Sequence, residues 1–303
     1  MRSGPDYIQF YPTLRCNRAC GFCFNRSMAG MEDMQLSAFE RMLEVLKQKG
    51  VQTLDIIGGE PTLHGAIVDL VRRAAGGGLF VNLSSNGSRP DILEKIMDLG
   101  PRVRVGISIN DQETLAQTAA FIRSRRPVVK TVYSPGQGST LAKAVLDLHP
   151  ARYYLIYRDA LDRGELTLTV AFDRFLSAVE AEYDPALTGT VSCSGFLPDE
   201  GCPELRYVRC PAGTTKLGIM PDGSVYPCNL FFGRKEFRLG NILTDPFETI
   251  WTNRILSFFR TKTTNVCTGK SCKLHATCHG GCPAQSLLLT GSLAGPDPRC
   301  ATR

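Results

Sequence analysis

Three cysteines follow an apolar, β-prone run near the start of the chain. The run covers residues 7–12, and Cys16, Cys20 and Cys23 follow it at the spacing C-x3-C-x2-C. Thiolates close together on one loop can each hold one iron of a [4Fe–4S] cluster. Three protein ligands leave the fourth iron open to substrate, whereas structural zinc takes four ligands. The spacing predicts an iron–sulfur cluster with one iron available for chemistry. The alternative is three unrelated buried thiols.

A glycine-rich turn and several polar residues follow later apolar runs. The turn is Gly58–Gly59–Glu60–Pro61. Its glycines allow a close backbone approach to a ligand, and Glu60 can accept a hydrogen bond from an ammonium group. Taken alone, the turn is weak evidence for a ligand site, and a plain strand-to-helix connection is the default interpretation. The polar residues at later strand ends are Ser85, Asn86, Ser108 and Asn110, with Lys130 in the fifth run. The serines and asparagines suit either ligand contacts or turns, and Lys130 suits either a ligand contact or an exposed surface position.

These motifs together resemble a radical S-adenosylmethionine (SAM) enzyme, and Phe22, just before the third cysteine, adds to the resemblance. The resemblance implies that Cys16, Cys20 and Cys23 are the catalytic cluster ligands and that the open iron chelates the amino and carboxylate groups of SAM. An electron then cleaves the sulfonium, and the 5′-deoxyadenosyl radical released abstracts a hydrogen atom. The cofactor-binding residues it implies are Phe22, Gly58, Gly59, Glu60, Pro61, Ser85, Asn86, Ser108, Asn110 and Lys130.

The composition narrows the class of protein. With 303 residues and 43% apolar content, the chain can bury one large core, or a core and a smaller module. The net charge of +6 is modest, and Arg123, Arg125 and Arg126 fit a solvated helix end better than a nucleic-acid site. No membrane span or signal peptide is predicted. We therefore expect a cytoplasmic protein whose twelve cysteines bind metal rather than form disulfides.

Short β-rich runs alternate with helical patterns up to about residue 185. The expected strands are 7–12, 51–57, 79–84, 103–109, 127–133 and 152–157. Helical periodicity appears between them, and Ser37 with Glu40 reads as a capping box that starts the first helix. The alternation predicts an α/β fold, a partial (β/α)6 TIM-like barrel over residues 1–185 with active groups at the carboxyl ends of the strands.

The composition shifts near residue 186, which predicts a small cysteine-rich domain over residues 186–303. Its nine cysteines are Cys193, Cys202, Cys210, Cys228, Cys267, Cys272, Cys278, Cys282 and Cys300. Two short strands around the Pro-Asp-Gly turn at 221–223 predict a hairpin. Four-thiolate zinc sites are the alternative to iron–sulfur clusters here.

The cysteine spacing resembles the SPASM extension of radical SAM enzymes, except that four residues rather than two separate Cys267 from Cys272. The resemblance implies two auxiliary [4Fe–4S] clusters, and so three clusters in all. The first would use Cys202, Cys210, Cys228 and Cys282, with Cys193 as the alternative to Cys202. The second would use Cys267, Cys272, Cys278 and Cys300.

The resemblance implies an oxidoreductase that modifies or cross-links a ribosomal peptide. The runner-up is porphyrin side-chain modification in haem or haem d1 biosynthesis, and the non-enzyme alternative is an electron-transfer or zinc scaffold protein. The resemblance implies that sulfatase-maturing members carry a carboxylate proton acceptor directly after the cysteine that matches Cys228. Asn229 stands there in this sequence and cannot act as a base, which disfavours a sulfatase-maturing role. A low-potential donor of flavodoxin or ferredoxin type is an expected partner. Because only fifteen residues precede Cys16, we expect either a separate leader-binding protein or a substrate that needs no leader.

Overall fold

The chain divides into two compact units, each built from segments far apart in the sequence. The structure is a computed structural model that describes residues 4–26, 28, 30–135, 139–183, 188–191, 208–261 and 280–300. One unit combines Met1–Ile107 with Ala212–Arg260, and the other combines Ser108–Pro211 with Thr261–Arg303. The predicted ligands Cys193, Cys202, Cys267, Cys272 and Cys278 lie outside the described residues.

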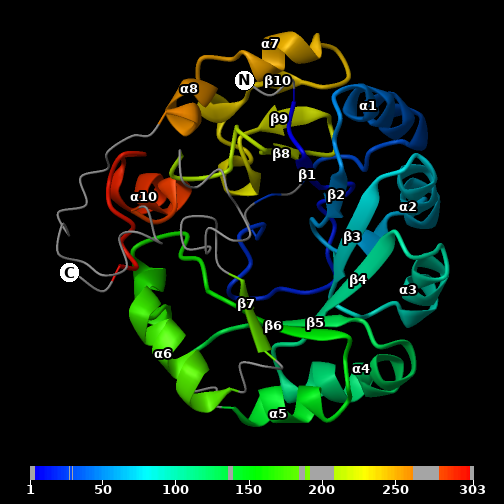
Figure 1. Cartoon of the computed structure of the whole chain (residues 1–303), viewed down its shortest axis with the longest axis vertical. Coiled ribbons are helices and arrows are strands. Elements are labelled where there is room, and N and C mark those ends of the chain that lie inside the picture. Colours follow the sequence, from blue (N-terminus) through cyan, green and yellow to red (C-terminus); the bar gives the residue numbers. More distant parts are fainter. Residues whose placement is uncertain are drawn as a thin grey trace. The chain divides into compact units, whose positions relative to one another are not determined.

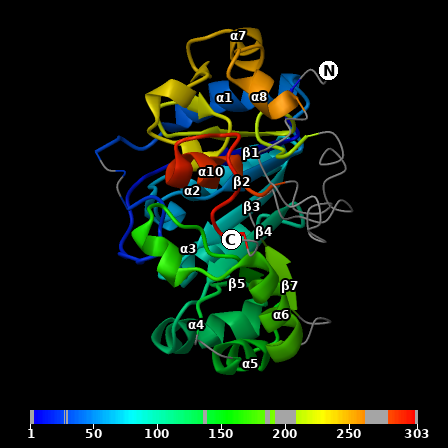
Figure 2. The ribbon, with the colours of Figure 1, turned by 90° about the vertical axis from the view of Figure 1, so that its left-hand side faces the viewer.

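Parallel strands form the sheet of the first unit. In chain order they are β1 (Tyr7–Phe10), β2 (Thr53–Ile56), β3 (Phe80–Ser85) and β4 (Val103–Ser108). Each strand pairs with the next, and Figure 2 shows them following one another in that order. Their carboxyl ends therefore lie along one edge of the sheet, as the sequence predicted for the polar strand ends.

Helices cover one face of this sheet. They are α1 (Leu36–Gln48), α2 (Ile67–Gly76) and α3 (Pro90–Met97), and Figure 1 shows them along the same side of β2, β3 and β4. Phe10 of β1 packs on Phe39 of α1 with ring centroids 5.5 Å apart. Side chains alternate between the two faces along each strand, so Gln9 of β1 and its register partner Asp55 of β2 lie on the opposite face. That face therefore carries polar side chains.

The start of α1 differs from the prediction. The capping box at Ser37 and Glu40 is wrong, because the helix begins at Leu36 and its N-cap is Gln35, which makes no side-chain capping bond. The segment before α1 is held instead by a backbone bond from Met34 N to Pro12 O of 2.9 Å. Tertiary anchoring thus replaces the local cap.

A hairpin continues the first unit's sheet on the far side of β1. The strands β8 (Lys216–Ile219) and β9 (Ser224–Tyr226) are antiparallel, as the Pro-Asp-Gly turn predicted, and Gly223 has the positive φ of 83° that this turn requires. β8 also runs parallel to β1, and β10 (Gly240–Asn241) pairs with β9. The pairing of β8 with β1 was not predicted. The short helices α7 (Phe247–Trp251) and α8 (Leu256–Arg260) follow.

Parallel strands and helices make up the described part of the second unit. The strands are β5 (Val128–Val132), β6 (Arg152–Ile156) and β7 (Thr188–Val191), and each pairs with the next. The helices are α4 (Gln112–Arg125), α5 (Thr140–Leu146), α6 (Phe172–Glu182) and, near the end of the chain, α10 (Pro283–Thr290). Tyr157, Phe172 and Phe175 form an aromatic cluster between β6 and α6.

All six strands expected before residue 185 are present within a few residues of their predicted bounds. The mixed α/β fold class with parallel strands is confirmed. Arg123 and Arg125 lie in the last turn of α4, as expected for a helix end. Among the described residues, no helix has both the length and the apolar content needed to cross a membrane.

Candidate active site

The loop that carries the three N-terminal cysteines lies between β1 and α1 and is anchored at both ends. At its start, Arg15 forms an ion pair with Asp33 and donates from Nη2 to the carbonyl of Leu63 at 2.6 Å. At its end, Asn25 donates from Nδ2 to the carbonyl of Gly58 at 2.7 Å. The loop is therefore tied to residues that follow β2.

The cysteines themselves differ in exposure. Cys16 is exposed, Cys20 and Cys23 are half-buried, and Cys23 N donates to Cys20 O at 3.0 Å. Burial raises the pKa of the Cys23 thiol, and the charge of nearby Cys16 raises it further. Across the described ranges, no three Cys, His, Asp or Glu side chains converge as ligands of a single metal ion. A [4Fe–4S] cluster instead requires one thiolate for each ligated iron.

The two glycines of the Gly58–Pro61 turn allow the turn to contact the cysteine loop. Gly59 N donates to Thr13 O at 3.1 Å, and Glu60 N donates to Arg15 O at 2.7 Å. A Cβ on Gly59 would lie 2.1 Å from the Arg15 carbonyl oxygen, far inside van der Waals contact. These glycines therefore bring the turn close to the backbone beside Cys16, and the close approach to a ligand stays a prediction.

Glu60 lies at the centre of a buried hydrogen-bond network. Its side chain is 1% exposed, and Oε1 accepts from Thr62 N at 3.0 Å and from Ser85 Oγ at 2.8 Å. Oε2 accepts from Asn86 N at 2.7 Å. The Asn86 side chain then donates to Asn17, the neighbour of Cys16, at 2.8 Å. The structure therefore brings Glu60, Ser85 and Asn86 together, as their positions at strand ends predicted.

The charge of Glu60 has no counterion in the part of the chain that the structure describes. Every partner of its carboxylate there is neutral: two backbone N–H groups and the hydroxyls of Thr62 and Ser85. A carboxylate offers about four lone-pair sites, so Oε2 can accept another donor. A buried anion without a counterion is costly, and a bound cation would offset that cost. The site is therefore suited to an ammonium group.

A second buried polar group is the hydroxyl of Tyr11, the residue directly after β1. This hydroxyl is fully buried, and among the described residues no donor or acceptor makes a hydrogen bond of regular geometry with it. Burial raises the pKa of Tyr11, while the side chains of Asn25 and Asn229 nearby lower it to a smaller extent. Asn229 N also donates to Gln9 at 3.3 Å. The segment after Cys228 is thus connected to β1.

The remaining predicted cofactor contacts occupy other strand ends. Ser108 ends β4, and Asn110 accepts from Val132 N at 2.8 Å, so its side chain joins the segment after β4 to β5. Lys130 lies in β5 and is half-buried. Phe22 is half-buried in the cysteine loop, and Pro61 begins the 3-10 helix η1 (Pro61–Leu63). None of these observations assigns a ligand to the side chains.

The described auxiliary cysteines are largely buried. Cys210 is 4% exposed, Cys228 is 8% exposed and Cys282 is 3% exposed, whereas Cys300 is half-buried. Cys228 precedes the 3-10 helix η5 (Asn229–Phe231), and Cys282 is the N-cap of α10. Each therefore sits at the start of a helical segment.

The sequence reasoning missed three buried charged residues beside these cysteines. Arg209 is 4% exposed, Asp297 is 1% exposed and Arg299 is 2% exposed. Burial tends to raise the pKa of Asp297, but the charge and hydrogen bonds of Arg299 outweigh it, so the pKa of Asp297 is lowered. One signal was available in the sequence, because an arginine directly precedes both Cys210 and Cys300.

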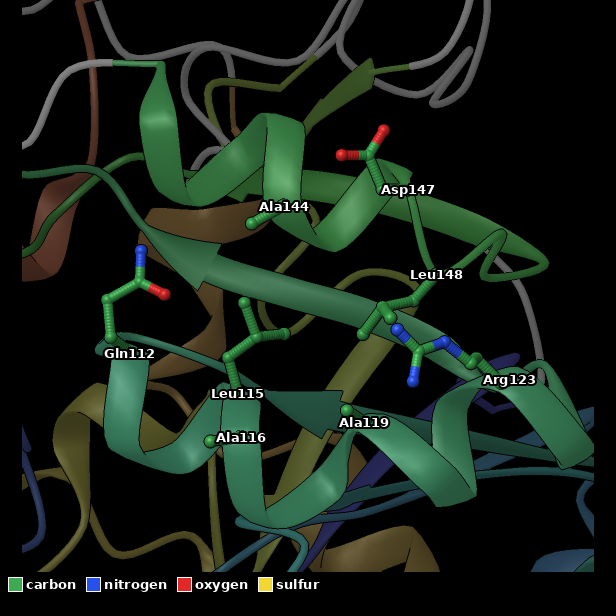
Figure 3. Close-up of a pocket in the computed structure, with 8 residues that line it drawn as sticks. All are labelled: Gln112, Leu115, Ala116, Ala119, Arg123, Ala144, Asp147 and Leu148. Carbon is green, nitrogen blue, oxygen red and sulfur yellow. The ribbon is translucent and has the colours of Figure 1, made fainter.

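A groove on the second unit lies apart from these residues. It has a volume of about 320 Å³ and lies between α4 and α5, as Figure 3 shows. Its lining consists of Gln112, Leu115, Ala116, Ala119, Arg123, Ala144, Asp147 and Leu148. No residue predicted for the site belongs to this lining.

Comparison with family models decides the family. A model of the radical SAM superfamily matches residues 10–133, which include the three cysteines, the Gly58–Pro61 turn and the polar strand ends. A model of an iron–sulfur cluster-binding domain, SPASM, matches residues 210–283. The chain belongs to the radical SAM superfamily. It is a radical SAM enzyme with an iron–sulfur cluster-binding SPASM domain.

Similar proteins match over nearly the whole chain. Mycofactocin maturase MftC of Mycobacterium ulcerans is 26% identical, and the match covers 98% of this chain and 88% of that protein. PqqA peptide cyclase of Streptomyces rochei is 25% identical, with coverage of 95% and 87%. The structure of Streptococcus suis SuiB bound to S-adenosylmethionine matches with a TM-score of 0.74 at 18% identity, over 99% of this chain and 78% of SuiB. This radical SAM enzyme therefore shares the fold of SuiB.

The residues of the first unit fit the cofactors of the superfamily. Three thiols on one anchored loop provide soft sulfur ligands for iron. The buried Glu60 carboxylate, which lacks a cationic partner among the described residues, suits the amino group of SAM. Iron–sulfur clusters and SAM are accordingly the cofactors of this radical SAM enzyme.

Proposed function

We propose that the enzyme oxidatively modifies or cross-links a ribosomally made peptide. The observation that carries this proposal is the set of similar proteins, which include a mycofactocin maturase and a PqqA peptide cyclase matched over at least 95% of this chain. SuiB bound to the precursor peptide SuiA also matches the fold, with a TM-score of 0.75. The polar sheet face that carries Gln9 and Asp55 suits the amide groups of a peptide.

The chain's own residues take the following roles in this proposal. The catalytic cluster is held by Cys16, Cys20 and Cys23. The Glu60 carboxylate accepts a hydrogen bond from the amino group of SAM, and Ser85 and Asn86 orient this Glu60 carboxylate. When bound, the cluster and SAM supply the 5′-deoxyadenosyl radical that removes a hydrogen atom from the substrate. The contacts from Asn25 and Arg15 keep the cysteine loop against the turn that carries Glu60.

We further propose the cluster count and the domain roles. Residues 1–185 carry the SAM chemistry and residues 186–303 hold two auxiliary clusters, which gives three [4Fe–4S] clusters in all. When bound, clusters held by these cysteines would supply an acceptor for the electron released when a substrate radical is oxidised to product. The pairing of β8 with β1 supports an association of the two sequence regions, because β8 follows residue 186 and β1 precedes residue 185.

The proposal also includes partners and location. SAM cleavage consumes an electron, so a donor of flavodoxin or ferredoxin type is required. A separate leader-binding protein is a further prediction, which co-purification tests. A cytoplasmic location is proposed from the cysteine content, because thiols stay reduced there.

Anaerobic turnover tests the core of the proposal. The reconstituted chain is reduced, mixed with SAM and a short peptide encoded beside its gene, and assayed for 5′-deoxyadenosine and for peptide mass. We expect 5′-deoxyadenosine release together with a peptide that has lost two hydrogens or a larger group. Replacing Cys16, Cys20 and Cys23 by alanine should abolish both products while the auxiliary clusters remain. Cleavage at an unchanged rate in this variant contradicts the assignment, and turnover of a porphyrin instead of the peptide contradicts the substrate class.

A further inference from the structure

Two buried arginines each directly precede a predicted auxiliary ligand. Arg209 precedes Cys210 and is 4% exposed, and Arg299 precedes Cys300 and is 2% exposed. A buried guanidinium is costly unless its donors are satisfied, so such residues stay buried where they organise the surrounding chain. Their partners lie within the second unit of the fold.

Arg209 binds the segment that leads into Cys282. Its Nη2 donates to Gly280 O at 2.6 Å, and its Nε donates to Gly281 O at 3.0 Å. Nη2 also donates to the hydroxyl of Ser286 on α10 at 2.9 Å. One planar group thus contacts both sides of Cys282, which lies between Gly281 and the helix.

Asp297 joins Cys282 to the residues around Cys300. Its Oδ2 accepts from Cys282 N at 2.9 Å, and its carbonyl accepts from Cys300 N at 3.1 Å. A Cβ on Gly281, whose φ is 77°, would lie 2.3 Å from the Cβ of Asp297. The glycine is therefore what allows the carboxylate to come this close to the Cys282 backbone.

Arg299 completes the network and connects it to the end of β6. Nε donates to Asp297 Oδ1 at 3.0 Å, and Nη1 donates to Asp159 at 2.8 Å. The guanidinium also lies over the Tyr157 ring, 4.8 Å from its centroid. The backbone next to Cys300 is consequently fixed by two carboxylates and an aromatic ring.

We propose that Arg209, Asp297 and Arg299 are positioning residues for the auxiliary iron–sulfur clusters. Cys210 and Cys282 belong to one predicted cluster and Cys300 belongs to the other. The Asp297 carboxylate therefore couples ligands of both clusters, with Arg209 holding the first pair. This inference rests on the proposed auxiliary ligation, but not on the identity of the substrate.

The test replaces Asp297 by asparagine in the full chain, which is then reconstituted anaerobically. Asparagine keeps the size but loses one acceptor and the negative charge. We expect iron and sulfide to fall from about twelve per chain toward about four, because one cube holds four irons. SAM cleavage by the N-terminal cluster should remain. Any auxiliary cluster that still assembles should have a more positive midpoint potential, which a purely structural role would not produce.

Controls keep the outcomes distinct. Asp69→Asn removes an exposed ion pair with Arg72 on α2 and should leave the iron content and potentials unchanged. If Asp297→Asn fails to fold, Arg209→Lys provides the same test, because lysine keeps the charge but cannot reproduce the planar set of donors. Full iron content with unchanged potentials in a folded Asp297→Asn or Arg209→Lys variant overturns the proposal. A wild-type chain that modifies no peptide but shows the expected iron losses in these variants refutes only the proposed substrate.

Discussion

Two carboxylates, one in each unit, are equally buried but have different partners. Glu60 and Asp297 are both 1% exposed. Asp297 is paired with Arg299 at 2.8 Å, whereas the partners of Glu60 among the described residues are neutral donors. Breaking a buried ion pair leaves a costly charge, so the Asp297 pair is a completed element of structure. In the proposed function, the Glu60 site is completed by a bound cation, as expected of a ligand site.

The largest effect should come from breaking the support of Glu60. In Gly59→Ala, the new Cβ would lie 2.1 Å from the Arg15 carbonyl, so the cysteine loop must move. Displacements of about 1 Å can cost roughly a hundredfold in rate, and we expect 5′-deoxyadenosine release to fall by at least that factor. Gly65→Ala is the matched control, because nothing lies within 4 Å of its Cβ position. Equal rates in the two variants would refute this role of Gly59.

Glu60→Gln tests the comparison of the two carboxylates directly. A hydrogen bond to a charged group contributes about 1.5–3 kcal/mol, so the Kd for SAM should rise by roughly tenfold to a hundredfold. Isothermal titration under anaerobic conditions measures this change. The control, Asp297→Asn, should leave the Kd for SAM unchanged. An unchanged Kd in Glu60→Gln as well would show that Glu60 does not contact SAM.

A smaller effect is expected from the exposed ion pair between Arg15 and Asp33. Burial tends to raise the pKa of Asp33, but the hydrogen bonds from Arg15 and Thr13 and the charge of Arg15 together outweigh it, so the pKa of Asp33 is lowered. A lowered folded pKa adds stability above the ordinary Asp pKa, and this stability is lost as the pH falls through the folded value. Because Arg15 is largely exposed, Asp33→Asn should lower the free energy of unfolding by no more than about 1 kcal/mol at neutral pH. Urea unfolding from pH 7 to pH 3 should show the difference disappearing; a difference that grows toward acid contradicts the pairing.

The smallest effect is expected at Tyr11, whose buried hydroxyl makes no hydrogen bond of regular geometry with the described residues. Removing this hydroxyl in Tyr11→Phe should leave the free energy of unfolding unchanged or raise it by up to about 1 kcal/mol. Thermal unfolding measures the change, with Tyr157→Phe as the contrasting variant, because Tyr157 donates to Val170 O at 2.6 Å. A loss of stability in Tyr11→Phe would indicate a partner for its hydroxyl.

Local patterns predicted most of the fold. Strand and helix periodicity reflects which face is buried, and Phe39, Met42, Leu43 and Leu46 are buried on α1 as their spacing indicated. The Pro-Asp-Gly turn identified the hairpin of β8 and β9. The parallel pairing of β8 with β1 was missed, because it joins Tyr7 to Lys216 and no local signal encodes such a separation.

For the candidate site, too, the sequence predicted local motifs but not the contacts between distant residues. The cysteine spacing and the Gly58–Pro61 turn are short motifs and were found, but the partners of Glu60 could not be read from the sequence. The Arg209 and Asp297 network was missed for the same reason, since Arg209 contacts residues 71 or more positions away. Hydrogen-bond partners of that kind are set by tertiary packing and not by local sequence.

The central claim is that SAM binds an iron that the Cys16, Cys20 and Cys23 loop leaves without a protein ligand. Electron paramagnetic resonance of the reduced chain, recorded with and without SAM, tests it most directly. The account predicts that SAM changes the signal of one cluster, that the change is absent when the three cysteines are replaced by alanine, and that Glu60→Gln requires more SAM to produce it. A wild-type signal that stays the same at saturating SAM would contradict the account.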